Sequence, residues 1–283
     1  MRHPRLTLAA ADLAAAGAAR PSLVAVAHGS RDPRAAATVS ELLKVVRERA
    51  SGLDVRAAFL DHCAPSLPQA LGSLEDRPAV VVPLLLTAAY HSKTDIPARL
   101  AEAAAARPGL TAASTGTLGP HPRLTIALER RLAEAGVAVG DPAARAATSV
   151  VLAAAGSSDP AANATIAALA ARWQRERGWR AVLPAYASAA GPRPAEAVAA
   201  LRSAQHNPAG MSPVVVATYL LAPGYFADKV RDAALSAGAV AVSGVLGAAP
   251  EVADTVIERY LDAVRAARPD RAPGRPAAVG AWG

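Results

Sequence analysis

The sequence predicts an α/β protein with two similar lobes, each a parallel sheet with helices on both faces, and a cleft between the lobes. Three observations support this fold class. Short runs of β-branched and apolar residues alternate with longer alanine-rich segments along the 283 residues. The predicted strands are continuously apolar, which is typical of parallel strands buried on both faces. The whole pattern also starts again about 127 residues later, which indicates an internal repeat of domain length.

The first half contains four predicted strands, each followed by a predicted helix. The strands are short and rich in Val, Leu and Ala, whereas the helical segments space their apolar residues three and four apart. The predicted strands are Ser22–Ala27, 55–60, 80–86 and 110–115, and the predicted helices are 34–50, 65–74, Ile96–Ala106 and 121–135. Crossovers between such strands are expected to be right-handed.

The second half repeats the landmarks of the first. The letters GSSDP from Gly156 stand 127 residues after GSRDP from Gly29, and each group follows a predicted strand. Ser188 stands 127 residues after Asp61 in the same way. The valine run at Val214 follows the run at Val80 by 134 residues, which predicts a small insertion within 205–212.

The repeat sets the expected domain boundaries. We expect a mobile leader over residues 1–20, a catalytic lobe over 21–140, a degenerate repeat lobe over 148–267 and a disordered tail over 268–283. The linker is predicted over 136–148, between the two repeats. A cleft between two such lobes is the natural place for a ligand.

Composition restricts the partners. A net charge of +7 suits an anionic ligand, but no basic stripe interleaved with aromatics is present, so a nucleic-acid partner is not expected. The single cysteine, Cys63, excludes an intramolecular disulfide and a cysteine-rich metal site. No apolar run reaches membrane-spanning length, so we expect no membrane partner. A cytoplasmic monomer or homodimer is predicted.

Ionisable residues follow the predicted strands of the first lobe. His28 follows the first strand, Asp61 and His62 the second, and His91 the third. Ligands of parallel α/β sheets bind at these strand ends. Imidazole and carboxylate suit iron, cobalt or nickel, and imidazole accepts protons near neutral pH. We therefore predict His28, His91 and Asp61 as metal ligands and catalytic residues. Strand alternation directs His62 away from Asp61, so a structural role is favoured for His62.

The second lobe has lost these groups. The positions that correspond to His28, Asp61 and His91 hold Ala155, Ser188 and Tyr225. This asymmetry predicts that the first lobe carries the chemistry and that the second shapes or closes the cleft.

Two loops are candidate anion sites. Each opens a predicted helix, where free backbone N–H groups and the helix dipole attract carboxylates. With Lys93, the predicted substrate-binding residues are Gly29, Ser30, Arg31, Gly156, Ser157 and Ser158. An ordinary helix cap is the alternative for both loops. The roles of His121 and Cys63 stay open.

Taken in order, these motifs resemble the sirohydrochlorin chelatases, the class II chelatases of siroheme and cobalamin synthesis, in their long single-chain form. The resemblance rests on HGSRDP from His28, FLD with PSL up to Leu67, PLLL through His91 and DIP, and LGPHP up to Pro122. It covers the first lobe nearly end to end and continues more weakly to about residue 267.

The resemblance implies a bilobal fold with an open tetrapyrrole cleft and insertion of a divalent metal into sirohydrochlorin with release of two protons. The paired family histidines correspond to His28 and His91, and a family glutamate corresponds to Asp61, one methylene shorter. Fe²⁺ is expected, with Co²⁺ a close second, as a substrate and with no organic cofactor. The alternatives are a non-catalytic carrier of metal or tetrapyrrole, and an α/β enzyme acting on an acidic metabolite.

Overall fold

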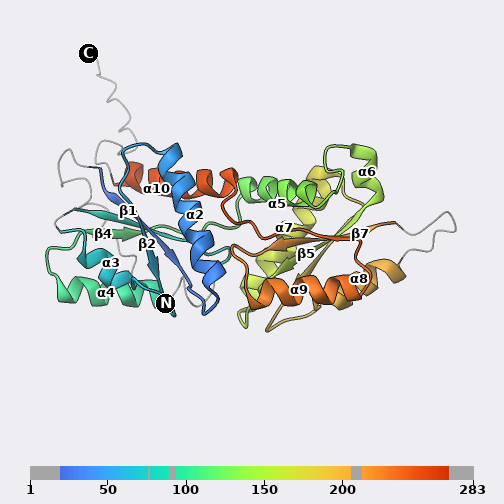
Figure 1. Ribbon diagram of the computed structural model, residues 1–283, viewed down its shortest axis with the longest axis horizontal. Helices are drawn as coiled ribbons and strands as arrows, with labels where there is room; N and C mark the ends of the chain where they lie inside the picture. Colours follow the sequence, from blue (N-terminus) through green and yellow to red (C-terminus); the bar gives the residue numbers. More distant parts are fainter. Residues whose placement is uncertain (1–19, 76, 89–93, 205–211, 268–283) are drawn as a thin grey trace, which may run out of the picture.

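Two four-stranded parallel sheets lie end to end in the structure, a computed structural model that describes residues 20–75, 77–88, 94–204 and 212–267 (Figure 1). The first has the strand order β2-β1-β3-β4 and the second the order β6-β5-β7-β8. All pairs are parallel, which confirms the predicted fold class. The strands are β1 Ser22–Ala27, β2 Val55–Phe59, β3 Ala79–Pro83, β4 Ala112–Ser114, β5 Ser149–Ala154, β6 Ala181–Tyr186, β7 Val214–Tyr219 and β8 Ala241–Val242.

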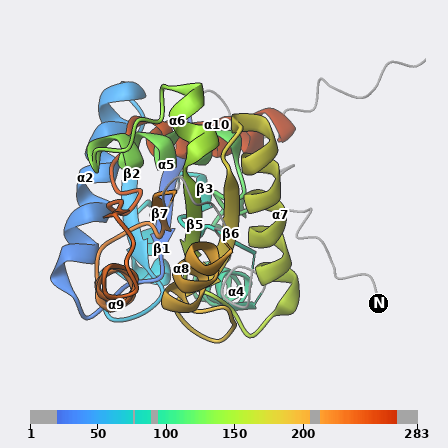
Figure 2. The same ribbon diagram turned by 90° about the vertical axis from the view of Figure 1, so that its right-hand side faces the viewer.

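Helices cover both faces of each sheet, as Figure 2 shows along the long axis of the molecule. They are α2 Pro33–Arg49, α3 Leu67–Gly72, α4 Ile96–Ala106, α5 Pro122–Glu134, α6 Pro142–Ala147, α7 Pro160–Arg177, α8 Pro194–Ser203, α9 Tyr225–Ser236 and α10 Pro250–Ala266. The central strands β1, β3, β5 and β7 are buried along their whole length, because helices exclude water from both sides.

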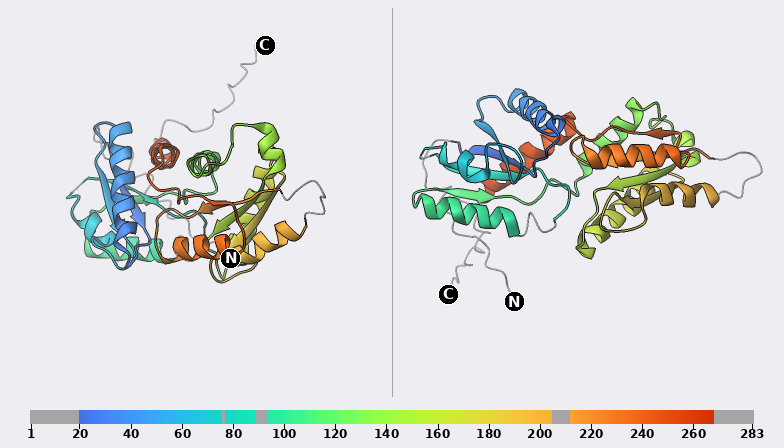
Figure 3. Two further views of the ribbon diagram at one scale, coloured as in Figure 1. Left: turned by 45° about the vertical axis from the view of Figure 1, so that its right-hand side comes forward. Right: turned by 60° about the horizontal axis from the view of Figure 1, so that its bottom comes forward.

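The two lobes exchange their last helices. Helix α10 packs on β3 and α2 of lobe one, whereas α5 packs on β7 of lobe two. Arg259 of α10 donates hydrogen bonds to the carbonyls of Thr117 and Leu118, and the Tyr260 hydroxyl donates to the carbonyl of Pro21 at 2.8 Å. Seen end-on, α5 and α10 lie side by side between the lobes (Figure 3, left). Each sheet is therefore completed by the other half of the chain.

On the lobe-two side, the exchange is secured by one buried carboxylate. Glu129 of α5 accepts hydrogen bonds from Trp173 Nε1 at 3.0 Å and from Arg177 Nε at 2.6 Å, both on α7. Its side chain is only 9% exposed. A buried carboxylate needs such donors to offset its lost hydration, so this contact fixes where α5 lies.

Some predicted boundaries were wrong. The third strand ends at Pro83 rather than at residue 86, because the apolar run continues past the sheet into the floor of the cleft. The predicted linker 136–148 contains helix α6, which Asp141 caps by accepting a hydrogen bond from the Ala143 N–H at 2.9 Å. Among the described residues, no helix is long and apolar enough to cross a membrane.

Candidate functional site

A cavity of about 690 Å³ lies between the lobes, at the carboxyl ends of both sheets. Lobe one contributes the residues that follow β1 and β3, and lobe two contributes those that follow β5 and β7. Its size is within the usual range for small-molecule sites. The predicted location, a cleft formed by strand ends, therefore matches the cavity that the structure contains.

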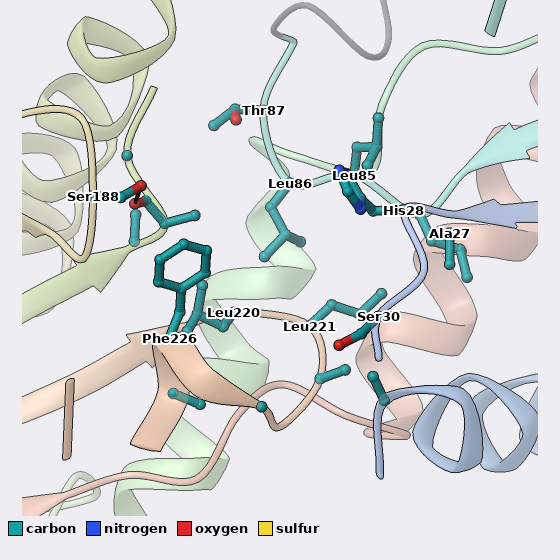
Figure 4. A pocket seen from close by; sticks show the side chains of 18 of the residues that line it. Ala27, His28, Ser30, Leu85, Leu86, Thr87, Ser188, Leu220, Leu221 and Phe226 are labelled. Atoms are coloured by element: carbon teal, nitrogen blue, oxygen red, sulfur yellow. Dashed lines mark hydrogen bonds between the residues drawn. The ribbon is translucent and has the colours of Figure 1, made fainter. Parts of the chain in front are cut away.

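His28 stands on the lobe-one wall of this cavity, directly after β1, and its side chain is exposed (Figure 4). Its Nδ1 lies 3.1 Å from the carbonyl oxygen of Gly29. A carbonyl only accepts, so Nδ1 carries the proton in this contact. The lone pair of the ring is then on Nε2, the atom that can bind a metal ion or take a proton.

Asp61 is held next to His28 through the backbone. The Asp61 N–H donates to the carbonyl of His28 at 2.9 Å, and the Asp61 side chain is exposed. Asp61 is not among the described residues that line the cavity, whereas its neighbour His62 is. The carboxylate predicted as a metal ligand thus lies outside the lining of this cavity.

The reasoning that set His62 aside was wrong, because strand alternation does not apply to it. Strand β2 ends at Phe59, and His62 lies in a turn with φ +62°. Its repeat partner Ala189 has the same backbone, with φ +59°. The turn places a second imidazole on the lobe-one wall, where lobe two has only a methyl group.

His91 and Lys93 lie outside the described residues, so their predicted roles stay predictions. Thr87, four positions before His91, lines the cavity beside Leu86 (Figure 4). Within the ranges the structure describes, no group of three or more His, Cys, Asp or Glu side chains is placed to hold a metal ion.

The two glycine loops have the same constrained backbone. Gly29 has φ +91° and Gly156 has φ +85°, a region that favours glycine. A Cβ on Gly29 would collide with the carbonyl oxygen of Asp61, and a Cβ on Gly156 would collide with that of Ser188. The close approach of backbone to backbone fixes both loops against the neighbouring strand end.

Both loops act as helix caps. Asp32 caps α2, and Asp159 caps α7. The backbone N–H of each aspartate donates to the serine two residues before it, from Asp32 to Ser30 Oγ at 3.1 Å and from Asp159 to Ser157 Oγ at 3.0 Å. In lobe two the Ser157 N–H also donates to Asn163 Oδ1 at 3.0 Å. An anion at that amide would have to displace Asn163, so the two loops differ in what they can bind.

Cys63 supports the lobe-one loop. Its thiol donates to the carbonyl of Ser30 at 3.3 Å, a contact that ties the turn after β2 to this loop. Arg31 lines the cavity with an exposed side chain.

An arginine links the two lobes at the edge of the cleft. Arg34 forms ion pairs with Asp32 of lobe one and with Asp228 of lobe two, each at 2.6 Å. The hydrogen bond from Arg34 lowers the pKa of Asp32.

The lobe-two wall has an apolar part that the sequence analysis did not foresee, formed by Leu220, Leu221 and Phe226. The predicted loop at Gly156 also lines this wall, as do Ala155 and Ser188, the positions that correspond to His28 and Asp61. The Ser188 hydroxyl donates to the carbonyl of Ala155 at 2.9 Å. The aromatic pair after Gly224 was the available signal, because aromatics make up only 4% of the chain.

The lobes also meet beneath the cavity. Burial raises the pKa of Tyr219, so its hydroxyl stays protonated, and it donates to the carbonyl of Leu86 at 3.3 Å.

His121, whose role the sequence analysis left open, is not among the described residues that line the cavity. It caps α5 by accepting from the Arg123 N–H at 3.3 Å, and its Nε2 lies 3.5 Å from Glu258 of α10. Burial lowers the pKa of His121 despite the attraction of Glu258.

Comparison with known proteins gives consistent relatives. The CbiX family model matches residues 22–135 and 149–263. Sirohydrochlorin ferrochelatase of Bacillus subtilis (strain 168) is 26% identical over 250 residues, which cover 86% of this chain and 92% of that protein. Sirohydrochlorin cobaltochelatase of Priestia megaterium is 31% identical over 149 residues, 51% of this chain and 47% of that protein. The chain therefore spans about half the length of the Priestia relative.

Solved structures share the fold. SirB from Bacillus subtilis with Fe³⁺ has a TM-score of 0.73 and 22% identity, and covers 87% of this chain and 96% of its own. SirB from Bacillus subtilis subspecies spizizenii in complex with cobalt has a TM-score of 0.70 and 21% identity over the same shares of the two chains.

Proposed function

The chain belongs to the CbiX family, and we propose that it is a sirohydrochlorin chelatase, which inserts a divalent metal ion into sirohydrochlorin. The observation that carries the proposal is the interlobe cavity, with the His28 imidazole on one wall and an apolar, aromatic surface on the other. Such a cavity suits a flat macrocycle, and it places a nitrogen of the His28 imidazole on the side from which a metal ion would reach the centre of the macrocycle. The names of two relatives, a sirohydrochlorin ferrochelatase and a sirohydrochlorin cobaltochelatase, support the same substrate.

The reaction exchanges two pyrrole protons for one M²⁺ ion. An imidazole nitrogen has one lone pair, so it cannot hold the metal ion and a proton at the same time. We assign both tasks to His28 and His91 in turn: the two imidazoles deliver the ion together, and as the ion passes to the macrocycle their two freed nitrogen lone pairs accept the two pyrrole protons, one each. General-base help of this kind typically contributes roughly 10²–10⁴-fold. Asp61 assists from outside the cavity lining by its negative charge, which favours both the cation and a protonated imidazole.

The substrate carboxylates are assigned to the basic side of the cleft. Arg31 and Lys93 are the proposed charged contacts, with the loops at Gly29, Ser30, Gly156 and Ser158 as backbone donors; the Ser157 N–H is left out because it donates to Asn163. The net charge of +7 supports an acidic substrate. We propose Fe²⁺ rather than Co²⁺ as the metal substrate. We further propose that the protein is a cytoplasmic monomer or homodimer, and that the reaction needs no organic cofactor, nucleic acid or membrane.

Metal-dependent turnover tests this function. Purified protein is mixed anaerobically with sirohydrochlorin and Fe²⁺ or Co²⁺, and the absorbance spectrum reports metallation. We expect multiple turnovers that a chelator abolishes. Tight binding of sirohydrochlorin without metallated product would identify a carrier instead, and activity on an acidic metabolite that survives the chelator would identify a different α/β enzyme.

A variant pair ties the activity to the site. His28→Ala is expected to lose turnover. His121→Asn is the control and is expected to keep it, because His121 is outside the cavity lining and asparagine can still accept the hydrogen bond that caps α5. Equal turnover of the two variants would contradict the assignment of His28.

A further inference from the structure

The lining of the cavity contains an unusual share of the chain's phenylalanines and tyrosines. The chain has two phenylalanines and five tyrosines, and the cavity is lined by both phenylalanines, Phe59 and Phe226, and by two of the tyrosines, Tyr219 and Tyr225. Tyr219 is buried under the floor. Tyr225 and Phe226 are instead on the surface of the cavity, at the start of α9.

These two side chains are exposed although burial would stabilise them. Phe226 is 41% exposed and Tyr225 is 71% exposed. Exposed aromatics that lie together in a concave site mark a surface for a ligand. Their rings are 5.6 Å apart with an interplanar angle of 59°, and the Lys229 ammonium lies 5.8 Å from the Tyr225 ring centroid. The two rings therefore offer a π-surface to the cavity, whereas Lys229 is not among the described residues that line it.

The backbone sets the position of this aromatic pair. Helix α9 begins at Tyr225, directly after Gly224, whose φ of +148° lets the chain turn sharply from the loop after β7 into the helix. Figure 4 shows the Phe226 ring projecting into the cavity, with Leu86 between it and the His28 ring on the opposite wall. Lobe two thus presents a ring where lobe one presents an imidazole.

We propose that Phe226, with Tyr225 beside it, is a specificity-determining residue that recognises an unsaturated macrocycle by stacking against its face. The inference rests on the proposed function. Contact of a flat π-system with an aromatic ring removes apolar surface from water and adds ring–ring attraction. The degenerate lobe then has its own task, to hold the macrocycle, while lobe one handles the metal ion and the protons.

Binding of metal-free sirohydrochlorin tests this division, measured anaerobically by the fluorescence of the tetrapyrrole. For Phe226→Ala we expect the Kd and the KM to rise by about tenfold or more, because the contact area of one aromatic side chain is lost. We expect kcat to stay within about threefold and Co²⁺ binding to stay unchanged. Phe226→Trp, which keeps a π-surface, is expected to restore most of the affinity.

Leu235→Ala is the matched control. Leu235 is on the same helix, is 42% exposed and is not among the described residues that line the cavity. We expect it to leave Kd, KM and kcat unchanged, and equal urea midpoints of the two variants show that neither acts through unfolding.

The outcomes separate this inference from the proposed function. An unchanged Kd and KM in Phe226→Ala, with normal turnover in the unmodified protein, overturns the role of Phe226 and leaves the chelatase function standing. Weaker tetrapyrrole binding in Phe226→Ala, in a protein that makes no metallated product, supports the recognition role and overturns the chelatase function.

Discussion

Replacement of Gly29 by alanine is the sharpest structural test of the loop next to His28. Gly29 combines a positive φ of +91° with a Cβ direction that meets the carbonyl oxygen of Asp61. Alanine therefore has two separate costs at this position, the strained backbone and the collision. Gly136→Ala is the matched control, because Gly136 has φ +85° and nothing within 4 Å of a built Cβ.

The magnitude follows from these contacts. A left-handed backbone costs an L-residue roughly 1–2 kcal/mol, and this cost applies at both positions. At Gly29 the Asp61 carbonyl must also move, which strains the hydrogen bond from Asp61 N–H to the His28 carbonyl, a bond contributing about 0.5–1.5 kcal/mol. We expect Gly29→Ala to lower the free energy of unfolding by about 1.5–3.5 kcal/mol, and Gly136→Ala by about 1–2 kcal/mol.

Urea unfolding of the two variants measures the difference, and sirohydrochlorin turnover of the folded fraction measures the effect on the site. Because the collision displaces the segment that carries His28, we expect Gly29→Ala to lose turnover as well as stability. Equal unfolding free energies for Gly29→Ala and Gly136→Ala, together with normal turnover, would refute this view of the loop.

Three further results are expected. His28→Ala should lower turnover by about 10²-fold or more while metal-free sirohydrochlorin binds within about threefold of normal; a large loss of that binding instead would make His28 a substrate contact. Glu129→Gln should lower the free energy of unfolding by roughly 1–3 kcal/mol, because Trp173 and the half-exposed Arg177 lose a charged acceptor; no change in a urea titration would argue against this anchor. Burial keeps the pKa of His121 below its ordinary 6.5, so the unfolded chain binds more protons and stability falls as pH drops below about 6.5; His121→Asn should flatten that part of the pH–stability curve, and an unchanged slope would contradict it.

The sequence predicts the central strands of both sheets well, for a physical reason. Strands such as β1 and β5 are buried on both faces, so their residues form continuous apolar runs bounded by glycine, proline and charged residues. The predicted first strand and the predicted helix Ile96–Ala106 agree with the structure in both bounds.

The helix exchange could not be predicted in this way. The apolar faces of α5 and α10 suit either sheet, and the choice depends on distant partners such as Trp173 for Glu129 and Pro21 for Tyr260. Local periodicity carries no information about these contacts.

The position of His28 at the cavity could be predicted from the sequence, because the residue that directly follows a buried parallel strand must reach the edge of the sheet. Its catalytic role stays a prediction. The side-chain direction expected for His62 was wrong, because that direction depends on where β2 ends and on a positive φ, neither of which strand alternation describes. Phe226 was missed because an apolar residue in a repeat lobe is usually part of a core, and only the structure shows it facing the cavity.

Anomalous diffraction from a crystal of the protein loaded with Co²⁺ tests the central proposal most directly. We predict one strong peak at the lobe-one wall of the cavity, at a coordination distance of about 2.0–2.2 Å from a ring nitrogen of His28, with His91 as its second imidazole ligand. A peak elsewhere, or one at this wall that persists in His28→Ala, would contradict it.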